Sequence, residues 1–243
     1  MSVDRINRAV RNNAEWCEIV CALHGNSGTF VDAMWMNRGR VPRFYPNVQT
    51  LAREAPGQIK LIEELIRLRL PIGWAVKDSF ASLNLAPLGF TLLFEAQWIF
   101  LAQEKVRSLA SAAPRWETLR FENAVAQWES AWRDANGDTN TARIFLRELL
   151  DNPDVAIVAG YRDEHIVAGA IGNRSSGVVG WSNFFAVRGE DTRVCAAGSL
   201  AQISRNFPDT AIVGYEEGEM LRLAESLGFE ALGPLRVWLF DGR

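Results

Sequence analysis

Three consecutive residues near the C-terminus, Tyr215, Glu216 and Glu217, place a hydroxyl beside two carboxylates. A carboxylate with a raised pKa can take a proton from a reacting group, directly or through water, so these residues are candidates for acid–base chemistry. Acidic residues ahead of a helix also favour its positive end and cap its amides, and a tyrosine at a strand end commonly packs its ring. Both interpretations stay open at this point.

The elements that would position these residues follow from apolar spacing and turn residues. Ala211–Val213 is β-rich and leads into them. The helix after them is predicted by an apolar stripe at i, i+3, i+4 and i+7, made of Met220, Leu223, Ala224 and Leu227. Gly228 suits the end of that helix, and short strands are expected at Phe229–Leu232 and Leu235–Leu239, on either side of Gly233-Pro234.

Upstream of this region, short polar turns separate β-rich runs, which predicts antiparallel hairpins. The predicted strands are Trp116–Phe121, Val155–Arg162, His165–Asn173 and Gly177–Val187. The predicted helices are Asn123–Arg133, Thr141–Leu150 and, approximately, Ala196–Phe207. Alanines, serines and Pro114 interrupt the pattern in a way that is typical of a connector. We therefore expect modules at 1–103 and 115–243, joined by a connector at 104–114.

The N-terminal half has helical spacing at Val3–Leu23 and Gln58–Leu70, and β-prone stretches at Thr29–Met36 and Val48–Leu51. Gly73–Leu101 repeats the order of the C-terminal end, with an acidic turn, a Leu-Gly-Phe sequence and a strand that carries a tryptophan. An internal duplication would explain this repeat. Chance would explain it too, because Gly-Phe after a helix is common, and both explanations stay open.

Residues 115–239 are predicted to form a strand, two helices, three antiparallel strands, a helix, a strand, a helix and two strands. This order resembles the GNAT acyltransferase superfamily over about half of the chain. The resemblance implies an α/β (α+β) fold whose mixed, mainly antiparallel sheet is flanked by helices. Together with the repeat, it suggests two tandem GNAT-like modules. It also implies that the strands Gly177–Val187 and Ala211–Glu216 splay apart around the pantetheine arm of an acyl-CoA.

The family's phosphate-binding sequence, R/Q-x-x-G-x-G/A, is matched by Arg193–Gly198, with Ala196 in place of the first glycine. In the family, the pyrophosphate lies on amides at a helix start, where free N–H groups and the helix dipole favour an anion. The resemblance implies these cofactor-binding residues: Phe184, Phe185, Ala186, Val187, Arg193, Ala196, Ala197, Gly198 and Ser199. The alternative is a helix start that binds nothing, since Glu190 and Asp191 would oppose a pyrophosphate unless they point away.

The family often has a helix tyrosine that protonates the leaving thiolate, at the position where this chain has Ala224. The nearest replacement in sequence is Tyr215, Ser182 is a further candidate, and Glu216 is the candidate base. The resemblance thus implies an acyl-CoA-dependent N-acyltransferase, with acetyl-CoA as donor, a small-molecule or peptide amine as acceptor, and direct attack on the thioester. The alternative is a non-catalytic acyl-CoA-binding or regulatory protein on the same scaffold.

The amino-acid composition limits the binding partners and the cellular compartment that we expect for this protein. A net charge of -3 over 243 residues provides no broad basic field, so we expect no nucleic-acid partner. The sequence has no apolar run of signal-peptide or membrane-span length, which predicts a cytoplasmic protein with no membrane partner. Cys17, Cys21 and Cys195 have no histidines at ligand spacing, so we expect buried thiols and no metal. A homodimer is an open expectation.

A polar loop in the N-terminal half contains Arg38, Arg40, Arg43, Tyr45 and Asn47. Such a cluster would suit an anionic acceptor, because guanidinium groups pair with carboxylates and phosphates. A solvated, arginine-rich loop without a ligand is the simpler alternative.

Overall fold

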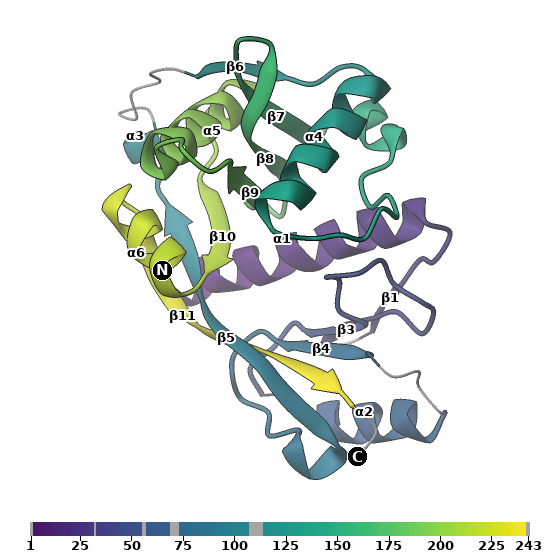
Figure 1. Ribbon diagram of the computed structural model, residues 1–243. Coiled ribbons are helices and arrows are strands. Elements are labelled where there is room, and N and C mark those ends of the chain that lie inside the picture. The colour runs from purple at the N-terminus through teal and green to yellow at the C-terminus, as the bar shows by residue number, and fades with distance from the viewer. Residues whose placement is uncertain (1, 32, 55–56, 69–72, 107–113, 242–243) are drawn as a thin grey trace. The chain divides into compact units, whose positions relative to one another are not determined.

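The computed structural model describes residues 2–31, 33–54, 57–68, 73–106 and 114–241. The chain falls into two compact units (Figure 1). The first unit comprises Met1–Trp98, Tyr215–Glu217 and Ala231–Arg243, and the second comprises Ile99–Gly214 and Gly218–Glu230. Neither unit is continuous in sequence, and residues 231–243 belong with the N-terminal part of the chain.

The first unit contains two helices and a sheet in the strand order β1-β2-β3-β4-β11-β5. Its elements are α1 (Ser2–Leu23), β1 (Thr29–Val31), β2 (Met34–Met36), β3 (Val48–Thr50), α2 (Gln58–Arg67), β4 (Ala75–Asp78), the 3-10 turn η1 (Ala86–Leu88), most of β5 (Phe90–Leu101) and most of β11 (Glu230–Phe240). The strands β1, β2 and β3 are antiparallel, β3 and β4 are parallel, and β4 and β11 are antiparallel.

Successive side chains of these strands point to opposite faces of the sheet, so some face α1 and the others face α2. On one side, the buried Trp35 packs with the apolar stripe of α1, and Gln49 donates a hydrogen bond to the backbone oxygen of Val10 at 3.0 Å. On the other side, a buried cluster joins residues of β2, β3 and β4 to Ile62 and Leu65 of α2. The strands are therefore covered on both faces, and Lys77, next to Gln49 in the ladder, lies on the α1 side.

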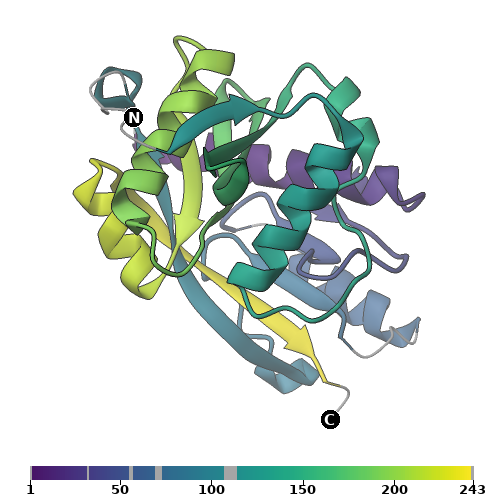
Figure 2. The same cartoon turned by 45° about the horizontal axis from the view of Figure 1, so that its top comes forward.

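The second unit contains the antiparallel ladder β6-β7-β8-β9, to which β10 adds in parallel. Its elements are α3 (Gln103–Val106), β6 (Arg115–Thr118), α4 (Glu122–Ala135), the 3-10 turn η2 (Arg147–Asp151), β7 (Val155–Arg162), β8 (His165–Ser175), β9 (Val178–Ala186), α5 (Thr192–Asn206), most of β10 (Ile212–Glu216) and α6 (Gly218–Ser226). Helices α4 and α5 cover opposite faces of β7, β8 and β9 (Figures 1 and 2).

Small residues allow these helices to approach the sheet closely. Gly169 of β8 lies against the indole of Trp128 from α4, so a Cβ there would overlap the ring. Gly172 of the same strand lies against Ile203 of α5. The Trp128 indole N–H donates to the carbonyl of Val158 at 2.9 Å, which satisfies the polar atom of this buried ring.

The two units share one order of elements. Each has three antiparallel strands, a helix (α2 or α5), and then a strand parallel to the third (β4 or β10). This shared order supports the interpretation of the sequence repeat as tandem GNAT-like modules. The structure therefore has the mixed, mainly antiparallel α/β arrangement that the sequence predicted.

Three sequence predictions need correction, and one lies partly outside the described residues. Thr141–Leu150 does not form the predicted α-helix. The amide of Ile144 donates to Glu129 of α4, and the helical part of this segment is the 3-10 turn η2. A single strand, β11, runs through Gly233-Pro234 where two strands were predicted. Helix α5 starts at Thr192, four residues before Ala196. In the predicted connector 104–114, residues 107–113 lie outside the described part of the chain.

A substitution in α5 tests the packing of the second unit. A Cβ at Gly198 would overlap the indole nitrogen of Trp116. We expect Gly198→Ala to lower the free energy of unfolding by about 1–3 kcal/mol through overpacking, although glycine-to-alanine in an unstrained helix would raise it by about 1 kcal/mol. Urea denaturation measures the difference. Trp116→Phe provides room, so the cost of Gly198→Ala should shrink in that background; an equal cost in both backgrounds would contradict the packing.

Candidate functional site

The parallel ladder between β9 and β10 is short. It consists of the pairs Val179 with Ile212 and Gly180 with Val213. Beyond Gly180, β9 continues to Ala186, paired with β8 on its other side. Among the described residues, β10 forms no ladder pair with β9 after Gly180, although Gly214 of β10 still lies against the backbone oxygen of Trp181. A strand edge of this kind presents N–H and C=O groups that an extended ligand can pair with.

A β-bulge interrupts β9 along this same stretch. Ile171 pairs with Ser182 and Gly169 with Phe185, so Ala170 alone opposes two residues, Asn183 and Phe184. Asn183 has a φ of 53°, in the left-handed region that non-glycine residues rarely adopt. A bulge leaves its extra residue out of the ladder and commonly redirects a strand beside a functional site. The backbone at Asn183–Phe184 is therefore a candidate hydrogen-bonding position.

The bulge also changes which face each aromatic ring occupies. Phe184 lies against Trp181, with ring centroids 5.2 Å apart, and Trp181 stacks on Phe229 at 5.7 Å. Phe185 turns the other way and meets Trp128 edge-on at 5.3 Å. Phe185 is 4% exposed, so its side chain belongs to the core under α4. Of the two predicted cofactor-binding rings, Phe184 is the half-buried one.

The remaining predicted residues of β9 lie at its centre and its end. Ser182 is half-buried, and its hydroxyl accepts a hydrogen bond from the side-chain amide of Asn183 at 3.0 Å. Ala186 pairs with β8, and the amide of Val187 donates to Val167 at 2.9 Å. Both are partly exposed at the exit from the strand. The structure thus brings Ser182, Phe184, Ala186 and Val187 together along one strand.

The start of α5 is capped by Asp191. Its carboxylate accepts hydrogen bonds from the amides of Arg193 and Val194 at 2.9 and 3.0 Å. Ala196, Gly198 and Ser199 are buried further along the helix, and Ala197 is partly buried. Within a helix these amides bond to carbonyls four residues back. The amides at the start of the helix therefore belong to residues 192–194, and Asp191 occupies two of them.

The charged groups around this helix start are largely paired. Arg162 holds Glu190 through two hydrogen bonds of 2.8 Å, and this contact lowers the pKa of the Glu190 carboxyl. The Arg193 guanidinium donates to the hydroxyl and backbone oxygen of Ser226 at the end of α6. Arg188 is exposed in the loop before α5 and makes no hydrogen bond or ion pair with the described residues. Sequence reasoning missed Arg188, although it lies immediately after the predicted strand.

In the first unit, Tyr215 belongs to a buried polar cluster. The Lys77 ammonium donates to the Tyr215 hydroxyl at 3.3 Å and to the Asn13 side-chain oxygen at 2.7 Å. It also lies 4.4 Å from the centre of the Tyr215 ring, which meets Trp98 edge-on. Lys77 is 4% exposed, and no carboxylate pairs with it among the described residues. Because the ammonium occupies an acceptor position of the hydroxyl oxygen, the Tyr215 proton is left for another acceptor.

Glu216 has an environment suited to proton transfer. Burial, and then the neighbouring Glu217 carboxylate, raise the pKa of Glu216 from 4.5 to about 7. Both causes act in one direction, since burial disfavours the charged form of Glu216 and Glu217 disfavours a second negative charge beside its own. A carboxylate that titrates near neutrality can accept a proton from a reacting group and release it again. Glu216 follows Tyr215 directly in β10.

Other groups in the described residues give no sign of metal or thiol chemistry. All three cysteines are free and buried, and burial raises the pKa of each. Within the described ranges, no group of three histidine, cysteine or acidic residues could hold a metal ion. Within the same ranges, no helix has the length and apolarity that a membrane span requires.

Comparison with solved structures identifies the fold. The chain is similar to a GCN5-related N-acetyltransferase from Kribbella flavida (14% identity, TM-score 0.64, covering 97% of this chain and 96% of that one). It is also similar to a functionally unknown protein from Staphylococcus epidermidis (10% identity, TM-score 0.66, 89% and 94%) and to a tandem GNAT protein from the clavulanic acid biosynthesis pathway (12% identity, TM-score 0.55, 95% and 94%). No protein-family model and no curated protein matches the sequence. The chain has a GNAT fold.

The raised pKa of Glu216 predicts how the free energy of unfolding changes with pH. The folded protein holds this proton up to about pH 7, whereas the carboxyl of the unfolded chain loses it near pH 4.5. The free energy of unfolding should therefore fall as pH rises between these values. Glu216→Gln cannot release a proton, so its unfolding free energy should fall less than that of the wild type between about pH 5 and pH 8.

Urea denaturation at both pH values measures this difference. The exposed Glu225 on α6 provides the control, and Glu225→Gln should keep the pH dependence of the wild type. If Glu216→Gln loses as much stability as the wild type over this range, the raised pKa is wrong.

Proposed function

We propose that this protein is an acyl-CoA-dependent N-acyltransferase, with acetyl-CoA as donor and a small-molecule or peptide amine as acceptor. One observation carries the proposal: the ladder between β9 and β10 ends after two pairs, and β9 then continues with a bulge on its open stretch. The GNAT fold of the structural neighbours supports the same activity. A cytoplasmic location would agree with the use of acetyl-CoA.

In this proposal, the pantetheine arm pairs with the backbone of β9 between Ser182 and Ala186. Extended amide-containing chains bind free strand edges through main-chain hydrogen bonds. The backbone N–H at the Asn183–Phe184 bulge donates to the thioester oxygen, where negative charge develops during attack. Phe184 contacts the acyl-CoA through its partly exposed ring, and Ala186 and Val187 border the arm where it leaves the strand.

The phosphates bind at the start of α5. The helix dipole and the Thr192 amide favour an anion there, and Arg188 supplies a guanidinium with no partner among the described residues. Asp191 must move its carboxylate away if the amides of Arg193 and Val194 are to join the site. The predicted contribution of Ala196–Ser199 is then structural, through close packing of the helix.

The chemical step is direct transfer. The amine nitrogen attacks the thioester carbon, Glu216 accepts the proton that the nitrogen loses, the carbon–sulfur bond breaks, and Tyr215 protonates the departing thiolate. Lys77 then stabilises the oxygen of Tyr215 through the hydrogen bond already present. Ser182 is a further hydroxyl that borders the open stretch of β9.

A second candidate function is acyl-CoA binding without turnover. It is favoured by Ala224, which is fully buried where the family often has its acid, and by the Asp191 cap on the helix start. Binding of acetyl-CoA without release of CoA across a panel of amines would support this candidate. The release of CoA is followed by thiol titration.

Binding is tested by calorimetry with acetyl-CoA. We expect saturable binding, a rise in melting temperature, and about three- to tenfold weaker binding for Arg188→Ala, because one charge-assisted contact is lost. Arg205, at the far end of α5, is bonded to Gln202 and gives the matched control Arg205→Ala. Absence of binding by the wild type would refute the proposed function; equal affinity in both variants would refute only the role of Arg188.

Turnover is tested with Glu216→Gln. With an amine substrate, we expect kcat/KM to fall about 10²-fold or more, because the variant has no proton acceptor at this position. The wild-type rate should rise with pH around pH 7, as Glu216 loses its proton, and the variant should lack that rise. Retention of the pH-dependent rise in the variant would assign the base to another residue.

A further inference from the structure

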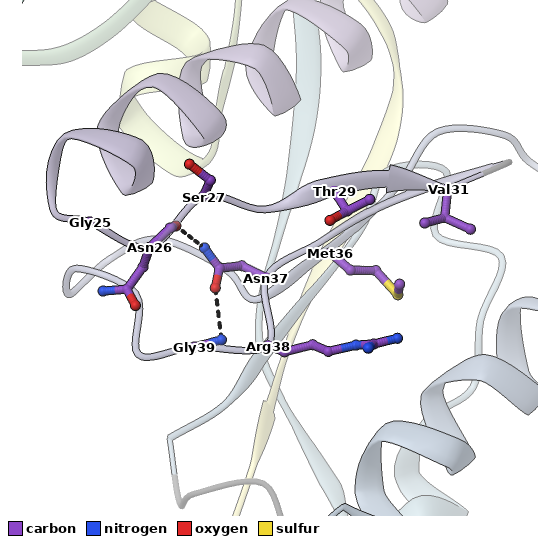
Figure 3. A pocket seen from close by; sticks show the side chains of 9 residues that line it. All are labelled: Gly25, Asn26, Ser27, Thr29, Val31, Met36, Asn37, Arg38 and Gly39. Carbon is purple, nitrogen blue, oxygen red and sulfur yellow. Dashed lines mark hydrogen bonds between the residues drawn. The ribbon is translucent and has the colours of Figure 1, made fainter.

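The first unit contains a cavity of about 400 Å³ beside the β1–β2 hairpin. Two segments line it, Gly25–Ser27 with Thr29 and Val31, and Met36–Gly39 (Figure 3). This volume lies within the range of small-molecule sites, about 300–1,000 Å³. The cavity is near the loop between β2 and β3. The helix start that would correspond to the proposed phosphate site of the second unit lies elsewhere, between β3 and α2.

Buried amide side chains hold the walls of the cavity in place. Asn37 donates to the carbonyl of Asn26 at 2.5 Å and accepts from the amide of Gly39 at 2.9 Å (Figure 3). Asn47 donates to the carbonyls of Asn37 and Gly39 at 3.2 and 3.0 Å. Asn37 and Asn47 are 1% and 3% exposed, so these bonds are shielded from water. The two lining segments are thus tied to each other before any ligand binds.

Glu18 of α1 fixes the segment between the helix and β1. Its carboxylate accepts hydrogen bonds from the amide of Gly28 at 2.7 Å and from the indole of Trp35 at 2.8 Å. A Cβ at Gly28 would lie 2.5 Å from that indole, and a Cβ at Gly39 would lie 2.8 Å from the side-chain oxygen of Asn26. Glycine is therefore required at position 28 for this close approach, whereas a Cβ at position 39 would displace the Asn26 side chain.

The side chains that hold the cavity walls in place are not the ones that are available to bind a ligand. The side chains of Ser27, Thr29 and Arg38 line the cavity and make no hydrogen bond or ion pair with the described residues. None of the nine lining residues is acidic, so Arg38 gives the lining a single positive charge. Val31 and Met36 supply an apolar side, and Figure 3 shows the extended Arg38 side chain below them. A positive end beside an apolar surface selects for a ligand that has both an anion and a hydrocarbon part.

We propose that this cavity binds a small aliphatic carboxylate. The carboxylate pairs with the Arg38 guanidinium and accepts a hydrogen bond from the hydroxyl of Thr29. The aliphatic part contacts Val31 and Met36. The site lies wholly in the first unit and does not depend on the proposed acyl transfer.

The test is a titration of the full-length protein with isovalerate, followed through backbone amide NMR signals. The amides of Gly25 and Gly39 report on the cavity itself. We expect saturable shifts at these amides in the millimolar range, and much weaker binding of isovaleramide, which has the same shape without the charge. Equal binding of the acid and the amide would overturn the proposal, as would the absence of shifts at these amides.

Two arginine variants distinguish the site from a general effect of positive charge. Arg38→Gln should weaken isovalerate binding by about threefold or more, since an exposed ion pair is worth about that much. Arg40→Gln removes a charge two residues away that does not line the cavity, and should leave binding unchanged. Both residues are exposed, so both variants should fold. Equal loss in the two variants, or displacement of isovalerate by equimolar inorganic phosphate, would refute a carboxylate-specific site.

Discussion

The proposed ligand binding by the second unit depends on two parallel residue pairs between β9 and β10. Ile212 with Val179 and Val213 with Gly180 hold β10 against β9, and no further pair between them is recorded in the described residues. Peptide groups away from water need partners, so the rest of this edge must be satisfied by solvent or by a ligand. The bulge at Asn183 lies on that stretch, and the cap of α5 follows it in sequence. The proposed chemistry of the second unit therefore follows from where this ladder stops.

The first unit meets a different constraint, the burial of polar side chains under α1. Gln49 and Lys77 are paired in the ladder and both reach that helix, at Val10 and Asn13. An ammonium with no carboxylate partner among the described residues is costly to bury, because neutral acceptors recover only part of its hydration. The hydroxyl of Tyr215 is one of those acceptors. A single lysine thus links the packing of α1 to the position of the Tyr215 hydroxyl.

Local patterns predicted much of the fold and less of the site. The hairpins of β7, β8 and β9 could be predicted because alternation and polar turns act over few residues. The bulge at Asn183 depends on register with β8, and the contact of Lys77 with Tyr215 joins residues 138 positions apart, so neither has a local signal. Helix α5 starts directly after Asp191, whose carboxylate caps it, four residues before the predicted start at Ala196.

The crossing of the chain between units has a consequence for biosynthesis. β11 pairs with β4 in the first unit, yet the whole second unit lies between their paired residues in the sequence. N-terminal domains commonly fold while the ribosome is still adding residues. Here Val76 and Lys77 of β4 cannot acquire their partners Trp238 and Val237 until the residues of the second unit have been made. Until then, the edge of β4 that pairs with β11 stays unpaired. Translation speed and protection by chaperones should therefore affect the yield of folded protein.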